Sequence, residues 1–102
     1  MKGMKTNYFL YHGRKVRLVA TQYGDLSLAV LMYGTGEYDL IDVITMDVKS
    51  PYQSETDAFL DIHTCPDIES FIVDNKLGRP LHYREYFNGE IYPLYTLYTE
   101  QF

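Results

Sequence analysis

The sequence contains no tryptophan, a single cysteine and no long apolar run. Because one thiol cannot form an internal disulfide, Cys65 argues against a disulfide-stapled secreted fold and favours a reducing, cytoplasmic setting. The longest apolar stretch, residues 26–33, is too short to span a bilayer. We therefore expect no signal peptide, no membrane segment and no membrane partner.

The composition is that of one small folded domain. The chain has 102 residues, of which 46% are hydrophobic, so a core can form without metals or disulfides. Eleven tyrosines and five phenylalanines are present, and tyrosine is common in strands and in contact surfaces. We predict a flexible N-terminal tail at residues 1–6 and a single α+β domain over residues 7–102.

Charge is distributed unevenly along the chain. Residues 1–24 carry +5, residues 25–75 carry −10, and residues 76–102 are neutral, which gives the net charge of −5. A negative field repels nucleic acid and attracts basic surfaces, so we expect no direct nucleic-acid binding. Two interpretations of the acidic block stay open: a solvated, solubilising face, or a surface that binds a basic groove.

The sequence pattern of the first half predicts an antiparallel meander. Residues 15–23 alternate between apolar and polar side chains with a period of two, as a half-buried strand does. Glycine-containing turns at residues 12–14, 24–25 and 34–37 separate the segments. The strands are predicted at residues 8–11, 15–23, 26–33 and 38–48.

One helix is predicted over residues 65–77. Thr64 is expected to be the N-cap, with Asp67 as its capping-box partner and Pro66 in the first turn. Gly78 is expected to end the helix in a left-handed conformation.

The remaining segments favour strands. Residues 58–63 are interpreted as a strand, and residues 81–98 as two strands around Asn88-Gly89, a strong hairpin signal. Pro93 argues that the final strand lies at an edge or carries a bulge. The predicted fold is therefore α+β: a twisted antiparallel sheet of about five to seven strands with one helix packed on it.

No motif in the sequence specifies catalysis, so we expect a protein that is not an enzyme and has no cofactor or metal. On a strand, Asp61, His63 and Cys65 would share one face. A thiol, an imidazole and a carboxylate suggest a nucleophile and its base, or a metal site, but adjacent strand residues rarely converge on one point. The Gly-x-Gly at residues 34–36 lacks the rest of a phosphate-binding motif and favours a turn.

Several short stretches together resemble a known family. The first half contributes Gly13-Arg14, an aliphatic strand and a Gly-Asp turn. The second half contributes Asp61-Ile62-His63, Pro66, Ile68-Glu69-Ser70-Phe71-Ile72, Asn75-Lys76-Leu77-Gly78-Arg79-Pro80, Gly89 and Tyr92-Pro93-Leu94-Tyr95. Over roughly residues 7–98 this order resembles a small bacterial domain family of unknown function carried on conjugative elements and plasmids. Thr64-Cys65 departs from it, because asparagines are more usual there.

The resemblance also implies a partner. The length, the acidity and the stretch Gly78-Arg79-Pro80-Leu81 are similar to a plasmid-associated member described as an anti-CRISPR protein against type II systems. This implies an inhibitor in the cytoplasm of a bacterial host cell that binds a type II CRISPR-associated nuclease and interferes with guide-RNA loading. From charge and position alone, the expected contacts are Tyr38, Asp39, Asp42, Asp47, Tyr52, Glu55, Asp57 and Asp61.

Two other functions remain open at this stage. One is a protein-interaction module of a mobile genetic element whose partner is unrelated to CRISPR. The other is a small hydrolase or nuclease that uses His63 and Cys65.

Overall fold

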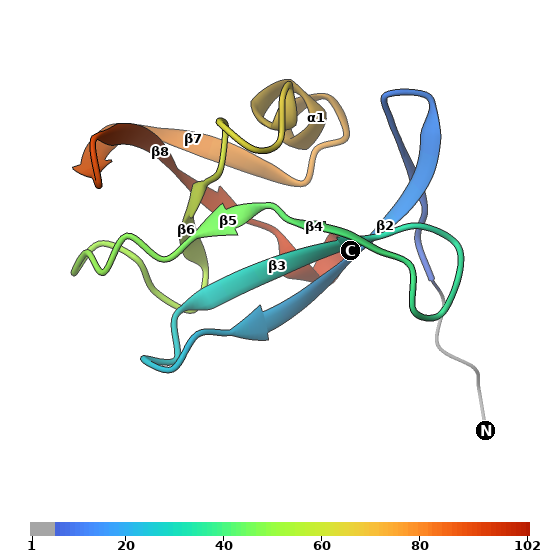
Figure 1. Ribbon diagram of the computed structural model, residues 1–102, viewed down its shortest axis with the longest axis horizontal. Coiled ribbons are helices and arrows are strands. Elements are labelled where there is room, and N and C mark those ends of the chain that lie inside the picture. The colour runs from blue at the N-terminus through green and yellow to red at the C-terminus, as the bar shows by residue number, and fades with distance from the viewer. Residues whose placement is uncertain (1–5) are drawn as a thin grey trace.

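The computed structural model describes residues 6–102, which form two four-stranded antiparallel sheets and one helix (Figure 1). Residues 1–5, most of the predicted tail, lie outside the described residues. The α+β class is confirmed, but the described part of the chain holds eight strands rather than five to seven. The strands are β1 (Phe9–Tyr11), β2 (Arg14–Gln22), β3 (Leu28–Tyr33), β4 (Leu40–Val43), β5 (Thr45–Met46), β6 (Asp57–Leu60), β7 (Gly78–Phe87) and β8 (Glu90–Leu97).

The first sheet is the predicted meander, in the order β1-β2-β3-β4. His12 and Gly13, with φ of 50° and 76°, form a two-residue turn between β1 and β2. Positive φ at both central positions gives a turn whose twist matches that of the strands it joins. The period of two is found in the first part of β2, where Val16 and Leu18 are buried and their neighbours are less so, but it does not extend to Ala20, which is exposed.

The predicted single strand over residues 38–48 is wrong, because the segment divides at Ile44 into β4 and β5. The Ile44 N–H donates to the Val30 carbonyl in β3 at 3.0 Å, and its carbonyl accepts the Asp61 N–H, beyond β6, at 2.9 Å. One extended segment thus borders both sheets, and Ile44 is fully buried at the crossing. Pairing with partners on two different sheets splits what the sequence presents as one run.

The second sheet has the order β5-β6-β8-β7. The prediction that Pro93 places the last strand at an edge is wrong, since β8 lies between β6 and β7. The irregular strand pairing that is expected beside a proline lies in the neighbouring strand β7 and not in β8. The pairing shifts between Pro80 and Arg84 of β7, opposite Pro93 and its successor, and His82 within this bulge has a φ of 59°.

The helix α1 spans Ile68–Asp74, shorter than the predicted 65–77. Asp67, not Thr64, is the N-cap, in a left-handed conformation without a side-chain cap. The Pro66 carbonyl accepts the Tyr11 hydroxyl at 2.6 Å, so the residues before Asp67 are bonded to β1 and remain outside the helix. At the other end the left-handed residue is Lys76, with φ of 57°, and Gly78 already belongs to β7.

Two apolar clusters hold these elements together. The larger lies between the sheets and α1, which packs between β7 and the β1–β2 hairpin (Figure 1). Alternation along β6 sends Ala58 and Leu60 into this cluster and Phe59 to the opposite face. There Phe59 joins Val48, from the segment between β5 and β6, in the smaller cluster. Within residues 6–102, no helix has the length and apolarity needed to cross a membrane.

The close packing at the start of β7 gives a testable prediction. A Cβ at Gly78 would contact the Thr96 carbonyl oxygen and would lie 2.9 Å from Leu97 Cδ2. We expect Gly78→Ala to lower the free energy of unfolding by about 1–3 kcal/mol, measured by urea denaturation. Gly24→Ala is the matched control, because a Cβ there meets nothing within 4 Å. Equal stability of the two variants would contradict this packing.

Candidate partner-binding surface

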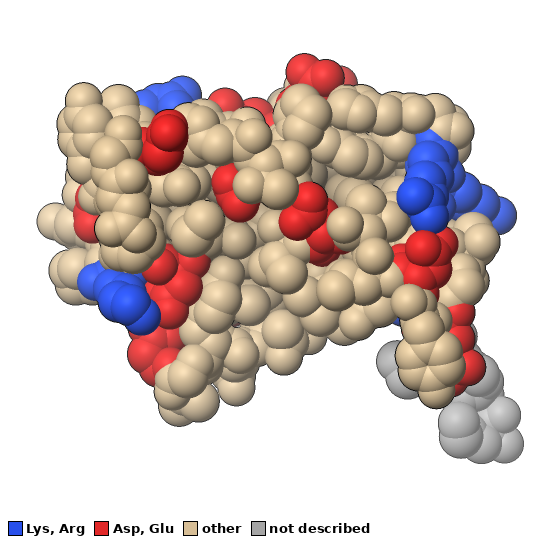
Figure 2. All heavy atoms as spheres, viewed as in Figure 1, with Lys and Arg blue, Asp and Glu red and all other residues tan. Residues whose placement is uncertain are grey.

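The acidic side chains do not form one continuous patch on the face shown in Figure 2. They gather there in several separate groups, and basic side chains lie beside the groups at both ends. On this face, acidic side chains therefore lie in separate groups and not in one continuous patch. The positions of the predicted contact residues in the fold show which of them lie on the same surface.

Two of the predicted residues lie at the turn between β3 and β4. Tyr38 is 90% exposed. Asp39 accepts a 2.7 Å hydrogen bond from the Arg14 guanidinium, so an internal cation balances this carboxylate. This turn therefore presents an exposed aromatic ring beside one carboxylate that is paired with a cation, Asp39, and one exposed carboxylate, Glu37.

Four more of the predicted residues are dispersed. Asp61 is only 6% exposed, and its carboxylate accepts the Thr64 N–H at 3.2 Å. Asp42 is half-buried in β4. Asp57 accepts the Thr96 hydroxyl at 2.7 Å. Glu55 is exposed, but it lines a separate shallow pocket beside β2.

The remaining two, Asp47 and Tyr52, lie together on the segment between β5 and β6. Three residues from other parts of the chain join them, one from the turn before β3 and two from β7. We call this group the carboxylate–tyrosine surface, and its members are Asp25, Asp47, Tyr52, Tyr83 and Glu85.

The side-chain amide of Gln53 links two of the carboxylates. Its Nε2 donates to Asp47 Oδ1 at 2.7 Å and approaches Asp25 Oδ2 at 3.4 Å. Its Oε1 accepts the backbone N–H of Val48 at 3.2 Å, which fixes the amide's orientation. A neutral side chain thus holds two carboxylates near each other, of which Asp47 is also paired with a cation, Lys49.

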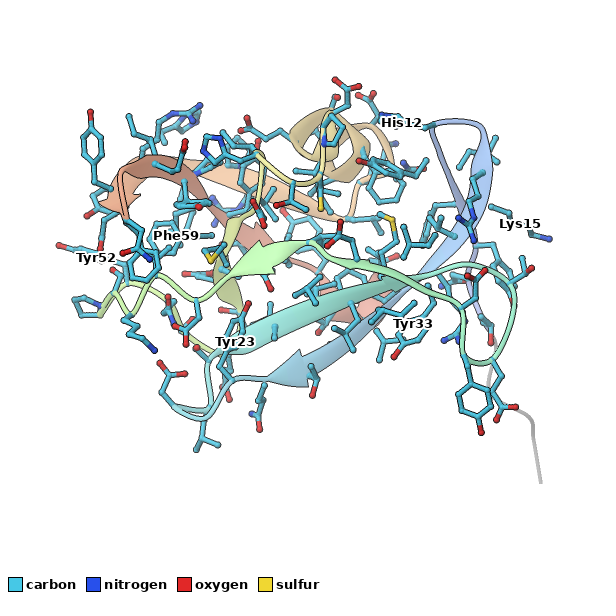
Figure 3. All side chains as sticks on the ribbon, viewed as in Figure 1. His12, Lys15, Tyr23, Tyr33, Tyr52 and Phe59 are labelled. Carbon is cyan, nitrogen blue, oxygen red and sulfur yellow. The ribbon has the colours of Figure 1, made fainter. Side chains whose placement is uncertain are left out.

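The third carboxylate is tied to the aromatic part of the surface. Glu85 Oε1 accepts hydrogen bonds from the Ser50 hydroxyl at 2.9 Å and the Tyr83 hydroxyl at 2.8 Å. The rings of Tyr52 and Tyr83 lie 4.8 Å apart at an angle of 56°. Tyr52 stands at one end of the long axis (Figure 3), and the Tyr83 ring lies 6.3 Å from that of the buried Phe59. Both tyrosine rings are exposed, so a partner can contact them directly.

One carboxyl and one tyrosine of this surface have shifted pKa values. The side-chain and backbone hydrogen bonds from Ser27 lower the pKa of Asp25. The hydrogen bond from its hydroxyl to Glu85 raises the pKa of Tyr83. Lys49 contacts Asp47 at 3.4 Å. A hollow beside it is lined by Gly24, Asp25, Asp47, Lys49, Ser50 and Pro51.

The alignment of Asp61, His63 and Cys65 on one strand is not found, because β6 ends at Leu60. The His63 ring faces β8, where Nε2 lies 2.9 Å from the Ile91 carbonyl and Nδ1 lies 3.2 Å from Glu90. The Cys65 thiol instead contacts the Val43 carbonyl. Among the described residues, no group of three or more His, Cys, Asp or Glu could hold a metal ion.

The environment of Cys65 gives a second prediction. Burial, followed by the charges of Asp42 and Asp61, raises the pKa of the thiol to about 12. At about pH 8 we expect a thiol-exchange reagent to label the folded protein more than about 100-fold slower than the unfolded protein, because the thiolate is the reactive form. Native labelling within about tenfold of the unfolded rate would contradict this environment.

Comparison with known proteins places the chain in a family. No curated protein and no solved structure is found to be similar to it. A family model described as a domain of unknown function, DUF4313, matches residues 18–102. This match spans all but the first strand and the start of the second. The chain therefore belongs to the DUF4313 family.

Proposed function

We propose that the protein is a non-enzymatic inhibitor of a type II CRISPR RNA-guided DNA nuclease. It binds the nuclease through the carboxylate–tyrosine surface and hinders guide-RNA loading. The observation that carries the binding mode is the linkage of three separate segments: Gln53 joins Asp25 to Asp47, and Ser50, which lines the same hollow, bonds to Glu85, which in turn bonds to one of two exposed, adjacent tyrosines. The nuclease as partner is proposed from the sequence resemblance.

The chemistry of such a nuclease fits this surface. RNA-guided nucleases hold nucleic acid in positively charged channels and recognise it through its backbone. Carboxylates fixed by hydrogen bonds can pair with the arginine and lysine side chains that otherwise contact phosphates. Exposed tyrosines supply apolar contact area and can stack on guanidinium groups. The carboxylates of this surface thus pair with the basic side chains of a cationic channel, and the tyrosine rings supply apolar anchors.

Competition with guide RNA follows from sharing the same cations. A channel filled by RNA has its positive charge neutralised and its surface covered, so the inhibitor would bind the RNA-free nuclease in preference. Long-range attraction between the acidic chain and the basic channel also accelerates encounter, and added salt weakens that attraction.

A capture experiment tests the partner and the step together. The immobilised protein is incubated with purified type II nuclease, either free or preloaded with guide RNA. We expect capture of the free nuclease and at least about tenfold less of the preloaded form, equivalent to about 1.4 kcal/mol. Equal capture of both forms would refute the loading step. Capture of neither, with no rescue of a targeted plasmid in cells, would instead favour an interaction module with a non-CRISPR partner.

A matched pair of variants tests the surface. Asp25→Asn, Asp47→Asn and Glu85→Gln together keep hydrogen-bonding groups but change the net charge from −5 to −2. We expect at least about tenfold weaker binding to the RNA-free nuclease, measured by titration calorimetry.

The control makes the same change in net charge away from this surface. It combines Glu37→Gln, Glu55→Gln and Glu100→Gln, all at exposed positions. We expect this control to bind within about threefold of the unaltered protein, because short-range pairing, and not total charge, holds the complex. Equal weakening by both variants would show that the carboxylate–tyrosine surface has no special part in binding.

A further inference from the structure

A second surface lies at the opposite end of the molecule, where a groove runs between β1 and α1. Phe71 of α1 and Tyr11 of β1 line it, and their rings meet edge to face with centroids 5.4 Å apart. His12 lies at this end of the groove, on the turn of the β1–β2 hairpin, in contact with Asp67 at 3.1 Å (Figure 3). The groove continues along β1 past Leu10 towards Lys15.

One wall of this groove is the free edge of a strand. Tyr11 and Arg14 flank the two-residue turn, so they form a hydrogen-bonded pair of the hairpin. Because such pairs alternate along a ladder, the next pair, Leu10 and Lys15, is non-hydrogen-bonded. The N–H and C=O of Leu10 therefore point away from β2. Outside the ladders, the backbone hydrogen bonds of the described residues include none to Leu10.

Side chains around this edge are apolar on the strand and acidic on the facing wall. The basic Lys15, which pairs with Leu10 across the hairpin, lies with its Nζ over the Tyr8 ring, 4.7 Å from the ring centroid. Leu10 is 68% exposed, so its side chain is available to a partner. The facing wall, α1 and its N-cap, carries the exposed acids Asp67 and Asp74. Asp67 is paired with His12, while no ion pair involves Asp74 among residues 6–102. The groove thus joins an open strand edge, an aromatic lining and a negative wall.

We propose that the β1 edge binds an extended, basic segment of a partner protein as an added antiparallel strand. The backbone of that segment bonds to the free N–H and C=O of Leu10, and its apolar side chains contact Leu10, which points away from α1 because its neighbours Phe9 and Tyr11 pack on Phe71. Its basic side chains face Asp74 and Asp67, and this charge complementarity selects a basic segment over an acidic one. The proposal does not depend on the nuclease, because it rests on other residues than the carboxylate–tyrosine surface.

The probe is a capped hexapeptide of alternating arginine and valine, added to the full chain. We expect amide hydrogen exchange of Leu10, followed by NMR, to slow by at least tenfold when the peptide is bound. A hexapeptide with glutamate in place of arginine should give no slowing. Unchanged exchange at Leu10 with the basic peptide, or equal effects of both peptides, would overturn the proposal.

The backbone contact can be removed without breaking the hairpin. Leu10→Pro lacks the outward N–H but leaves the β1–β2 hydrogen bonds intact, and Leu10→Thr keeps the N–H while shortening the side chain. We expect Leu10→Pro to weaken peptide binding at least tenfold and Leu10→Thr to weaken it less than about threefold. Thermal unfolding of each variant confirms that it is folded before binding is compared.

Two further readouts distinguish other occupants and the other surface. If a second copy of the chain occupies this edge, the protein dimerises with rising concentration and Leu10→Pro abolishes the dimer, which would overturn the assignment to a basic peptide. The variant Asp25→Asn, Asp47→Asn, Glu85→Gln should bind the peptide as the unaltered chain does. Loss of peptide binding in that variant would place the site at the carboxylate–tyrosine surface instead.

Discussion

The hydrogen bonds of Ile44 are the constraint on which the rest of the structure depends. Its N–H bonds to Val30 of the first sheet and its carbonyl accepts the N–H of Asp61, which directly follows β6 of the second. Because Ile44 is also fully buried, the crossing point is fixed by packing as well as by hydrogen bonds. The chain then continues from β5, which is an edge strand of the second sheet. The segment between β5 and β6 then packs on Phe59 through Val48 and bonds to Glu85 of β7 through Ser50.

This placement explains why the candidate surface forms from separate parts of the chain. The segment after β5 carries Asp47 and Tyr52, and Gln53 on the same segment links Asp47 to Asp25. Glu85 and its hydrogen-bonded tyrosine come from β7, the edge strand. Hydrogen bonds keep the carboxylates in place, so little ordering of side chains remains to be done when a partner binds.

The local sequence pattern predicted which segments form strands and a helix better than it predicted where these elements end or what they contact. The alternation along β2 depends only on neighbouring residues, and so does the Asn88-Gly89 turn. The structure contains both the strand β2 and the β7–β8 hairpin. The division at Ile44 could not be predicted, because it results from pairing with two sheets at once. The helix start was misplaced because the Thr64 and Cys65 N–H groups bond back to Asp61 and Asp67 adopts a left-handed conformation, neither of which the capping pattern reveals. Asp47 and Tyr52 were named from charge and position, but Tyr83 and Glu85 are brought to them only by the register of β7.

The most direct measurement is a hydrogen-exchange footprint of the protein bound to RNA-free nuclease. The account predicts slowed exchange at residues 47–53 and 83–85, with no change at the turn between β3 and β4, where Arg14 balances Asp39. Protection confined to that turn, or absent from both segments of the carboxylate–tyrosine surface, would contradict the proposed mode of binding.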